Sequence, residues 1–418
     1  MTQADSNAFC FIPYPAPSET LQKAPAAGGG PLAGLDFAVK DIYDVAGYPS
    51  GWGNPHALAL SGIKTQSAPV VQALQAAGAR VTGKVITDEL AFSMNGKNAH
   101  FGTPRNGAAP DRIPGGSSSG SASAVSNGLC DFAIGSDTGG SVRCPASHCG
   151  LIGLRPTHGR ISLAGCMPLA PGFDTCGWFA RDMAVFARVG EVLLGEDRQP
   201  LPAAPRLLLA ADILASLDTQ VQAAVQGVLA QLVRKPDAQG GEGEGGVGWT
   251  KPQPVDAWLM PSIDLYWAFR IIQGWEAWRS QGGMIERYGL QLGPGVRDRF
   301  AWSKDITAEQ VAPQLALRQA FTERLEALLG RDGVLLMPTM PQVAPLLSQS
   351  ETELEDYRNQ AIHMLCLSGL AGLPQISLPL MRIEGVPLGF SLLGPRGSDQ
   401  SLIALAARIM AGVARPAG

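Results

Sequence analysis

Short apolar segments alternate with helical ones in the first third of the chain. Residues 35–39 (LDFAV) have the continuous apolar run of a buried strand, and residues 80–86 (RVTGKVI) resume as a strand. Between them, Ser67 caps a predicted helix that has Pro69 in its first turn and Gly78 just beyond its end. This order predicts an α/β fold with a mixed, twisted β-sheet core covered by helices on both faces.

Strand-like segments recur near the C-terminus, so we expect one large domain over residues 1–418. Its predicted parts are a core with the candidate catalytic residues (30–195), a helical excursion that forms a variable, substrate-side region (195–330), and the C-terminal part of the same core (331–418). Within the excursion, residues 201–234 are predicted to be helical and residues 237–248 form a low-complexity loop.

Charge and cysteine content exclude several classes of protein. The net charge is −4 and the basic residues are scattered, which argues against nucleic acid as a partner. No apolar run reaches the roughly 18 residues that cross a bilayer, and the first residues lack a signal-peptide pattern, so we expect a cytoplasmic protein with no membrane contact. The seven cysteines form no CxxC pair, which predicts reduced packing thiols and no metal site. No organic cofactor is indicated.

Serine and glycine supply half of the 30 residues from Pro114 to Arg143. A phosphate-binding loop needs a lysine after its glycines, and no lysine lies between Lys97 and Lys235. Ser118 fits the GxSxG pattern of a nucleophile elbow, but the residues before it have the composition of a loop rather than of an apolar strand.

A third chemistry for this segment uses a lysine as the base. A serine that attacks must lose its proton, and a neutral amine can accept it if burial lowers the pKa of the amine towards 7 or 8, from about 10.4. Lys40, at the end of the predicted strand LDFAVK, is the candidate. Because neighbouring strand residues point to opposite faces, Asp41 need not pair with Lys40 and keep it charged.

These residues together resemble the amidase signature family of serine hydrolases. The similarity rests on AVKD at Lys40, GGSSSGS at 115–121 and GSDTGGSVRCPASHCGLIGLRPT at 135–157, in the family's order and spacing. Further segments similar to the family cover most of the chain outside 195–330. Their sequences are most similar to plant-type indoleacetamide amidases and their bacterial relatives. The resemblance implies the amidase signature fold and an amidase activity.

The resemblance also implies a catalytic triad. In the family pattern, Lys40 is the base, Ser117 follows a cis peptide bond and relays the proton, and Ser141, 24 residues later, is the nucleophile that forms an acyl-serine intermediate.

A tight DTGGS turn adds an oxyanion hole to this triad. The backbone N–H groups of Thr138, Gly139, Gly140 and Ser141 are predicted to converge on the substrate carbonyl oxygen, because glycine permits a close approach of the backbone.

Substrate contacts are predicted from weaker signals. Met94 and Asn95 lie where family members have a pocket-lining loop, and Arg143 either contacts substrate or orders the turn through an acid such as Asp137. Trp267 and Trp275 are near helical spacing and can form an aromatic wall. We therefore expect a small-molecule amide with an aryl or hydrophobic acyl group, released as an acid plus ammonia or an amine.

Several alternatives remain open at this stage. The same fold can serve as the glutaminase subunit of a tRNA amidotransferase, as an allophanate- or biuret-type hydrolase, or as a non-catalytic binding scaffold. A homodimer is also compatible with the sequence.

Overall fold

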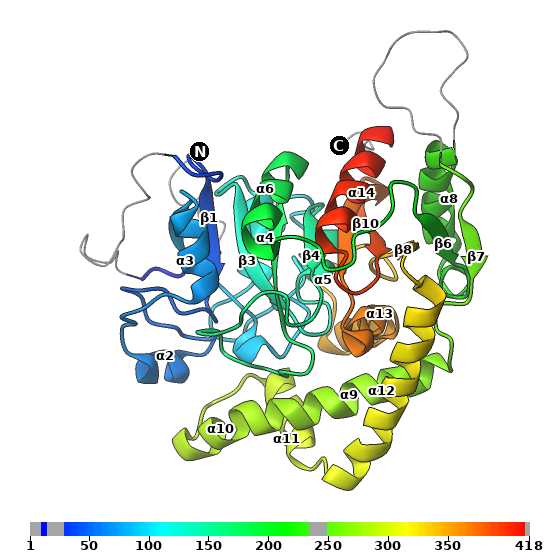
Figure 1. The fold of residues 1–418 in the computed structure, drawn as a ribbon. Coiled ribbons are helices and arrows are strands. Elements are labelled where there is room, and N and C mark those ends of the chain that lie inside the picture. Colours follow the sequence, from blue (N-terminus) through cyan, green and yellow to red (C-terminus); the bar gives the residue numbers. More distant parts are fainter. Residues whose placement is uncertain (1–9, 15–28, 234–248, 414–418) are drawn as a thin grey trace.

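Ten strands form one sheet across the molecule (Figure 1), in the order β2-β1-β3-β5-β4-β9-β10-β8-β6-β7. The computed structural model describes residues 10–14, 29–233 and 249–413, so the predicted loop at 237–248 lies outside the described residues. The strands are β1 (Asp36–Lys40), β2 (Arg80–Val85), β3 (Phe132–Asp137), β4 (Ile152–Arg155), β5 (Thr175–Ala180), β6 (Arg206–Ala210), β7 (Gln253–Val255), β8 (Gly333–Pro338), β9 (Gln375–Ile383) and β10 (Val386–Leu393).

The sheet is mixed. Strand β1 is parallel to both β2 and β3, each neighbouring pair from β3 to β8 is antiparallel, and β6 is parallel to β8 and β7. Every residue of β3, β4, β5 and β8 is buried, as expected for strands covered on both faces.

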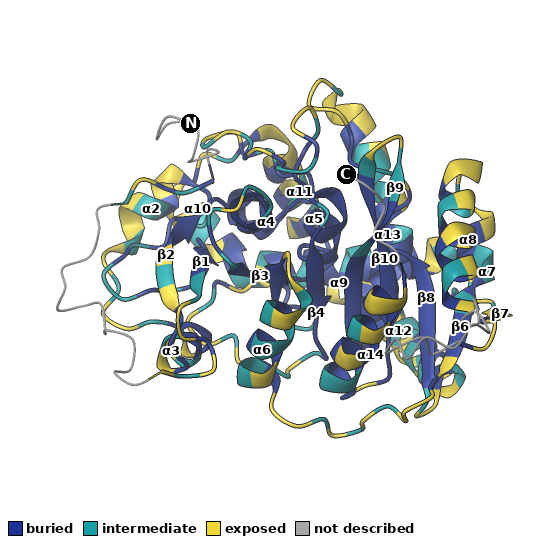
Figure 2. Ribbon diagram, turned by 90° about the horizontal axis from the view of Figure 1, so that it is seen from above, coloured by how far each residue is buried: buried dark blue, intermediate teal, exposed yellow. Residues whose placement is uncertain are grey.

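Helices cover both faces of the sheet. Figure 2 shows α3, α6 and α14 along one face and α4 and α5 on the other. The helices are α2 (Pro55–Ser61), α3 (Pro69–Ala76), α4 (Ser119–Ser126), α5 (Arg143–His148), α6 (Met183–Leu194), α7 (Ala211–Ala215), α8 (Thr219–Val233), α9 (Ser262–Ala277), α10 (Gly283–Tyr288), α11 (Pro294–Lys304), α12 (Ala308–Leu329), α13 (Glu351–Ala371) and α14 (Asp399–Gly412), with a 3₁₀ turn at Glu89–Ala91 and a π turn at Trp278–Gly282. The predicted fold class is confirmed.

Part of the predicted helical excursion belongs to the sheet. The prediction that residues 201–234 are helical is wrong over Arg206–Ala210, which forms β6 beside β8. The run RLLLA is too short and too uniformly apolar for its periodicity to separate a strand from a helix, and pairing with β8 decides the outcome. The division of the chain at residues 195 and 330 stays a prediction.

Candidate site residues lie at the edge of the sheet where strands β1, β3 and β4 end, at Lys40, Asp137 and Arg155. Strands β1, β3, β4 and β10 all point the same way, because an even number of antiparallel steps separates β4 and β10 from β3. Helices α9 to α12 lie beyond the edge at which these strands end (Figure 1). Among the described residues, no helix has the length and apolar character needed to cross a membrane.

Candidate active site

Lys40 ends β1 inside the protein. Its side chain is fully buried, and its Nζ lies 2.7 Å from Ser117 Oγ and 2.8 Å from Ser136 Oγ. Burial lowers the pKa of Lys40 to about 8, although Asp88 and more distant carboxylates oppose the shift. The amine is therefore held by two hydroxyl groups rather than by a carboxylate. Ser136 was not among the predicted site residues; a serine inside the apolar strand DFAIGSD was the available signal.

Asp41 turns away from Lys40, as the strand alternation predicts. Its Oδ1 pairs with Lys84 Nζ at 2.7 Å, and both side chains are almost completely buried. Its Oδ2 accepts hydrogen bonds from Tyr14 Oη and the Gly51 backbone, each at 2.9 Å. The neighbouring charge is thus neutralised on the other face of β1, which leaves Lys40 free of it.

The loop before α4 places Ser117 and Ser118 differently. The Gly116–Ser117 peptide bond is cis, as the family resemblance implies. Ser118 Oγ is buried and bonds the backbone of Ser136, 3.2 Å from both its N and its O. This position contradicts Ser118 as an exposed elbow nucleophile, and Ser118 makes no side-chain cap on α4. Ser118 N donates to Ser141 O at 3.3 Å, which ties the two serine loops together.

Asp137 organises the turn that carries Ser141. Its Oδ1 accepts a hydrogen bond from Gly140 N at 2.9 Å, and its Oδ2 accepts from Val142 N at 3.1 Å. The Arg143 guanidinium binds the same carboxylate twice, with Nε 3.0 Å from Oδ2 and Nη2 2.8 Å from Oδ1. A fully buried carboxylate therefore fixes both ends of the turn.

Two buried arginines keep this carboxylate ionised. Burial alone would raise the pKa of Asp137, but Arg143, Arg155 and the Val142 N–H outweigh it and hold the pKa well below its usual range. Arg143 is itself fully buried and also reaches Leu365 O at 2.9 Å. It has no surface left for a ligand, so the expected contact between Arg143 and substrate is wrong and its role in ordering the turn stands.

The DTGGS turn approaches its neighbours closely. A Cβ at position 139 would lie 2.5 Å from Phe269 Cζ, and one at position 140 would lie 2.5 Å from Leu365 Cδ1 in a residue with φ +122°. Gly140 N is already bonded to Asp137, so the predicted set of oxyanion donors loses this member. Within the described part of the chain, no acceptor is recorded for the N–H of Gly139 or of Ser141.

A small cavity of about 20 Å³ opens beside Ser141. Its lining residues are Ala91, Phe92, Ser93, Met94, Gly139, Ser141, Leu169, Phe269, Gln273, Arg358 and Ile362. Of the predicted substrate residues, Met94 is in this lining, whereas Asn95 is not. The cavity has room for about one water molecule, so side chains around it must move to admit an acyl group.

Trp267 and Trp275 do not form the aromatic wall that the sequence predicted. Trp267 points to solvent with 45% of its surface exposed, and Trp275 lines a separate cleft with Arg279 over its ring. Phe269, on the same helix α9, faces Ser141 instead. Helical spacing alone did not identify the inward face of α9, because the helix packs on α13 and on the turn that carries Ser141 as well as on α11 and α12.

Comparison with known proteins identifies the family of this chain. The family model described as Amidase matches residues 2–234 and 297–403. The chain is 39% identical to Amidase 1 of Arabidopsis thaliana over 97% of this chain and 98% of that protein. It is 34% identical to the chloroplastic Outer envelope protein 64 of the same plant, over 91% of this chain and 67% of that one.

A solved structure titled "Crystal structure of amidase" agrees with this assignment. It superimposes with a TM-score of 0.83 at 28% identity and covers 99% of this chain and 94% of its own. Fold and relatives define an amide hydrolase. The chain belongs to the Amidase family, the amidase signature family whose pattern the sequence resembles.

Replacing Asp137 by asparagine tests the role of the buried carboxylate. Asp137→Asn leaves Arg143 and Arg155 buried without their counter-charge, so we expect the free energy of unfolding to fall by about 3–5 kcal/mol in urea titrations. Asp332→Asn removes a carboxylate from an exposed pair with Arg206 (3.0 Å) and should change it by less than about 1 kcal/mol. Equal losses in the two variants would contradict the role assigned to Asp137.

Proposed function

We propose that this protein hydrolyses a small carboxylic acid amide through a Ser141–Ser117–Lys40 triad. The observation that carries the proposal is the buried Lys40 amine, which lies 2.7 Å from Ser117 Oγ and forms no salt bridge within the described residues. An amine with a pKa of about 8 is substantially neutral near that pH and can accept a proton. Allophanate hydrolysis or a non-catalytic scaffold has no comparable observation in its favour.

The reaction proceeds in two halves. Ser141 Oγ attacks the amide carbonyl carbon while its proton passes to Ser117 Oγ, and the Ser117 proton passes to Lys40 Nζ. The C–N bond then breaks, the same path returns a proton to the leaving nitrogen, and an acyl ester of Ser141 remains. Water hydrolyses that ester and releases the acid. Among the described residues, no hydrogen bond joins Ser117 Oγ to Ser141 Oγ, so the relay contact forms when substrate enters.

The carbonyl oxygen becomes negatively charged when Ser141 attacks, and it needs hydrogen-bond donors from the DTGGS turn. The N–H groups of Gly139 and Ser141 are the candidate donors, and the N–H of Thr138 is a third. Each such donor contributes about 2.7–4 kcal/mol to the stability of the transition state.

The lining of the cavity beside Ser141 favours an aryl or other hydrophobic acyl group. Phe92, Met94, Leu169, Phe269 and Ile362 supply half of the side chains that line it. Aromatic and aliphatic walls bind flat apolar groups through burial of apolar surface. The cytoplasmic location and the homodimer stay predictions.

A second substrate class is supported by one residue. Arg358 lines the same cavity, is 4% exposed, and its Nε is buried without a hydrogen-bond partner. Arg270, Arg299 and Arg358 share the single carboxylate of Glu355, which leaves excess positive charge beside the cavity. An amide that carries a carboxylate, such as glutamine, would use that charge. One relative, from Methanothermobacter thermautotrophicus and 29% identical, is named as part of a glutamyl-tRNA(Gln) amidotransferase.

The pH dependence of turnover tests the base. Below the pKa of about 8, Lys40 is protonated and cannot accept a proton, so kcat/KM should rise about tenfold per pH unit and level off above that pKa. Initial rates from pH 6 to 9, with circular dichroism at each pH as a control for folding, measure it. A flat profile over that range would overturn Lys40 as the base.

Covalent labelling tests the nucleophile. A fluorophosphonate should modify Ser141, and Ser141→Ala and Lys40→Met should each lower kcat by at least about a thousandfold while the protein stays folded. Ser118→Ala is the matched control from the same loop, because the Ser118 hydroxyl bonds the Ser136 backbone and the variant keeps every backbone contact, so it should keep the label. An adduct found on Ser118 by mass spectrometry would refute the assignment.

Substitutions in α9 and α13 separate the two substrate classes. Phe269→Leu should raise KM for arylacetamides about threefold to tenfold and leave propionamide unchanged, whereas Trp267→Leu, on the exposed side of α9, should affect neither. Arg358→Gln should impair glutamine and not arylacetamides if the carboxylate class is correct. Loss of glutamine turnover in Arg358→Gln together with no effect of Phe269→Leu would reject the aryl class.

A further inference from the structure

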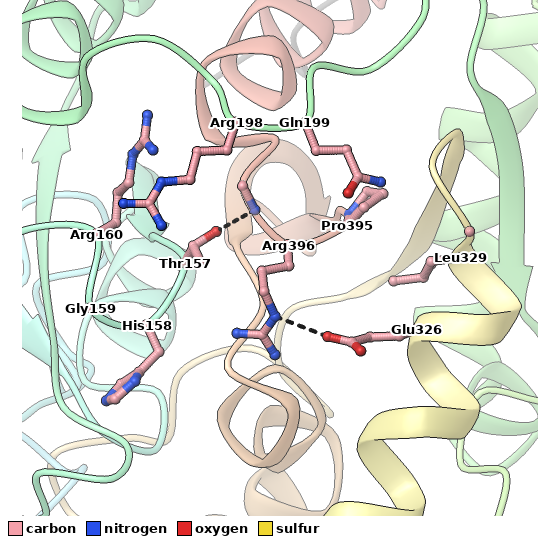
Figure 3. Close-up of a pocket in the computed structure, with 12 residues that line it drawn as sticks. Thr157, His158, Gly159, Arg160, Arg198, Gln199, Glu326, Leu329, Pro395 and Arg396 are labelled. Carbon is pink, nitrogen blue, oxygen red and sulfur yellow. Dashed lines mark hydrogen bonds and ion pairs between the residues drawn. The ribbon is translucent and has the colours of Figure 1, made fainter.

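A second, larger cavity lies at the same edge of the sheet as the catalytic turn. Its volume is about 550 Å³, and none of its lining residues borders the cavity beside Ser141. The loops after β4 and β10, the segment after α6 and the C-terminal end of α12 form its walls (Figure 3). We call it the arginine cleft, after Arg160, Arg198 and Arg396 in its lining.

Among the residues that line this cleft, basic side chains outnumber acidic ones. Glu326 is the acidic member of the lining residues, and its Oε1 lies 2.9 Å from Arg396 Nε. Within the described residues, neither Arg160 nor Arg198 forms a salt bridge, and Figure 3 shows both side chains extending towards the same end of the cavity. Two guanidinium groups that face one cavity repel each other unless an anion lies between them.

The nearby carboxylates are already engaged. Asp399 accepts hydrogen bonds from Thr157 N and Thr157 Oγ1, each at 2.7 Å. Asp197 accepts from the backbone N–H groups of Gln400 and Ser401, at 2.8 Å and 2.7 Å. Both acids bind groups at or near the start of α14, and Asp399 also interacts electrostatically with Arg160, so they offset part of the positive charge of the cleft.

Hydrogen-bonding capacity in the cleft is also unused. Arg160 donates through Nη2 to Glu196 O, but its buried Nε has no hydrogen-bond partner. For Arg198, no hydrogen bond or ion pair is recorded within the part of the chain that the structure describes. Leaving a buried donor unsatisfied is costly, and a guanidinium is the side chain best suited to bind carboxylate or phosphate oxygens in pairs.

We propose that the arginine cleft is a binding site for a small organic polyanion with at least two charged oxygen groups, phosphate or carboxylate. The cleft is larger than an inorganic ion needs and falls in the size range of small-molecule pockets, about 300–1,000 Å³. One anionic group binds between Arg160 and Arg198, and the second reaches towards Arg396.

The cleft is connected to the catalytic turn through a short segment. Thr157 lines the cleft, and two residues earlier Arg155 donates through Nη1 to Asp137 O at 2.7 Å and to Thr138 O at 3.2 Å. A bound anion that orders residues 157–160 also stabilises the position of Arg155. Ligand binding to the folded state should therefore raise the melting temperature of the protein, whatever the catalytic residues do.

Calorimetric titration with two probes tests the site. Inorganic pyrophosphate and citrate, titrated separately at low ionic strength, should bind with submillimolar Kd and raise Tm, and the tighter probe identifies phosphate or carboxylate as the preferred group. Sodium chloride at matched ionic strength should not reproduce the effect. Failure of both probes to bind, or equal effects of chloride, would overturn the proposal.

Variants locate the binding. Arg160→Gln/Arg198→Gln should weaken the affinity for the tighter probe by at least about tenfold, because both guanidinium groups that flank the first anionic group are lost. Arg198→Gln alone, at an exposed position without a partner, should fold normally and weaken it to a smaller extent. Arg297→Gln removes the same charge from an exposed site on α11 and should leave the affinity unchanged. Equal affinity in all variants would place the anion elsewhere and reject the cleft.

Discussion

The buried carboxylate of Asp137 is the interaction on which the rest of this structure depends. It ends β3, accepts the Gly140 and Val142 N–H groups, and binds Arg143 at the start of α5 and Arg155 at the end of β4. A single ionised group thereby joins β3, α5 and β4 around the turn that carries the candidate nucleophile. Such a group is stable in the interior only because two guanidinium groups and several N–H donors replace its water.

The surroundings of Asp137 favour its charged form, whereas those of Lys40 favour its neutral form. Asp137 is kept ionised by two arginines, whereas Lys40, a short distance along the same edge, is surrounded by hydroxyl groups and has a lowered pKa. The pairing of Asp41 with Lys84 on the other face of β1 removes the carboxylate that would otherwise keep Lys40 protonated. The placement of carboxylates on particular faces of two adjacent strands thus gives a turn held by hydrogen bonds and a buried lysine with a lowered pKa.

Segments far apart in the sequence meet at this edge. Residues of α9 and α13 close the cavity beside Ser141, while the loops after β4 and β10 and the end of α12 enclose the arginine cleft. Arg155 contacts the backbone of the turn and lies two residues from the cleft, so a ligand there acts on the loop that supports the turn. This gives residues 195–330 two roles, because they supply both a strand pair to the sheet and walls to both cavities.

By itself the sequence determined the fold class and the family and named Lys40, Ser117 and Ser141 as candidates, because these depend on local patterns and on the spacing of a long signature. It also indicated, through strand alternation, that Asp41 would face away from Lys40. Only the tertiary structure decided that Arg143 binds Asp137 and that Gly140 N donates to the same carboxylate. It also decided that Ser136 Oγ contacts Lys40 and that Phe269 rather than Trp267 lines the cavity beside Ser141. Each of these depends on contacts between residues distant in the chain, and helical or strand periodicity specifies a face of an element without specifying what will pack against it.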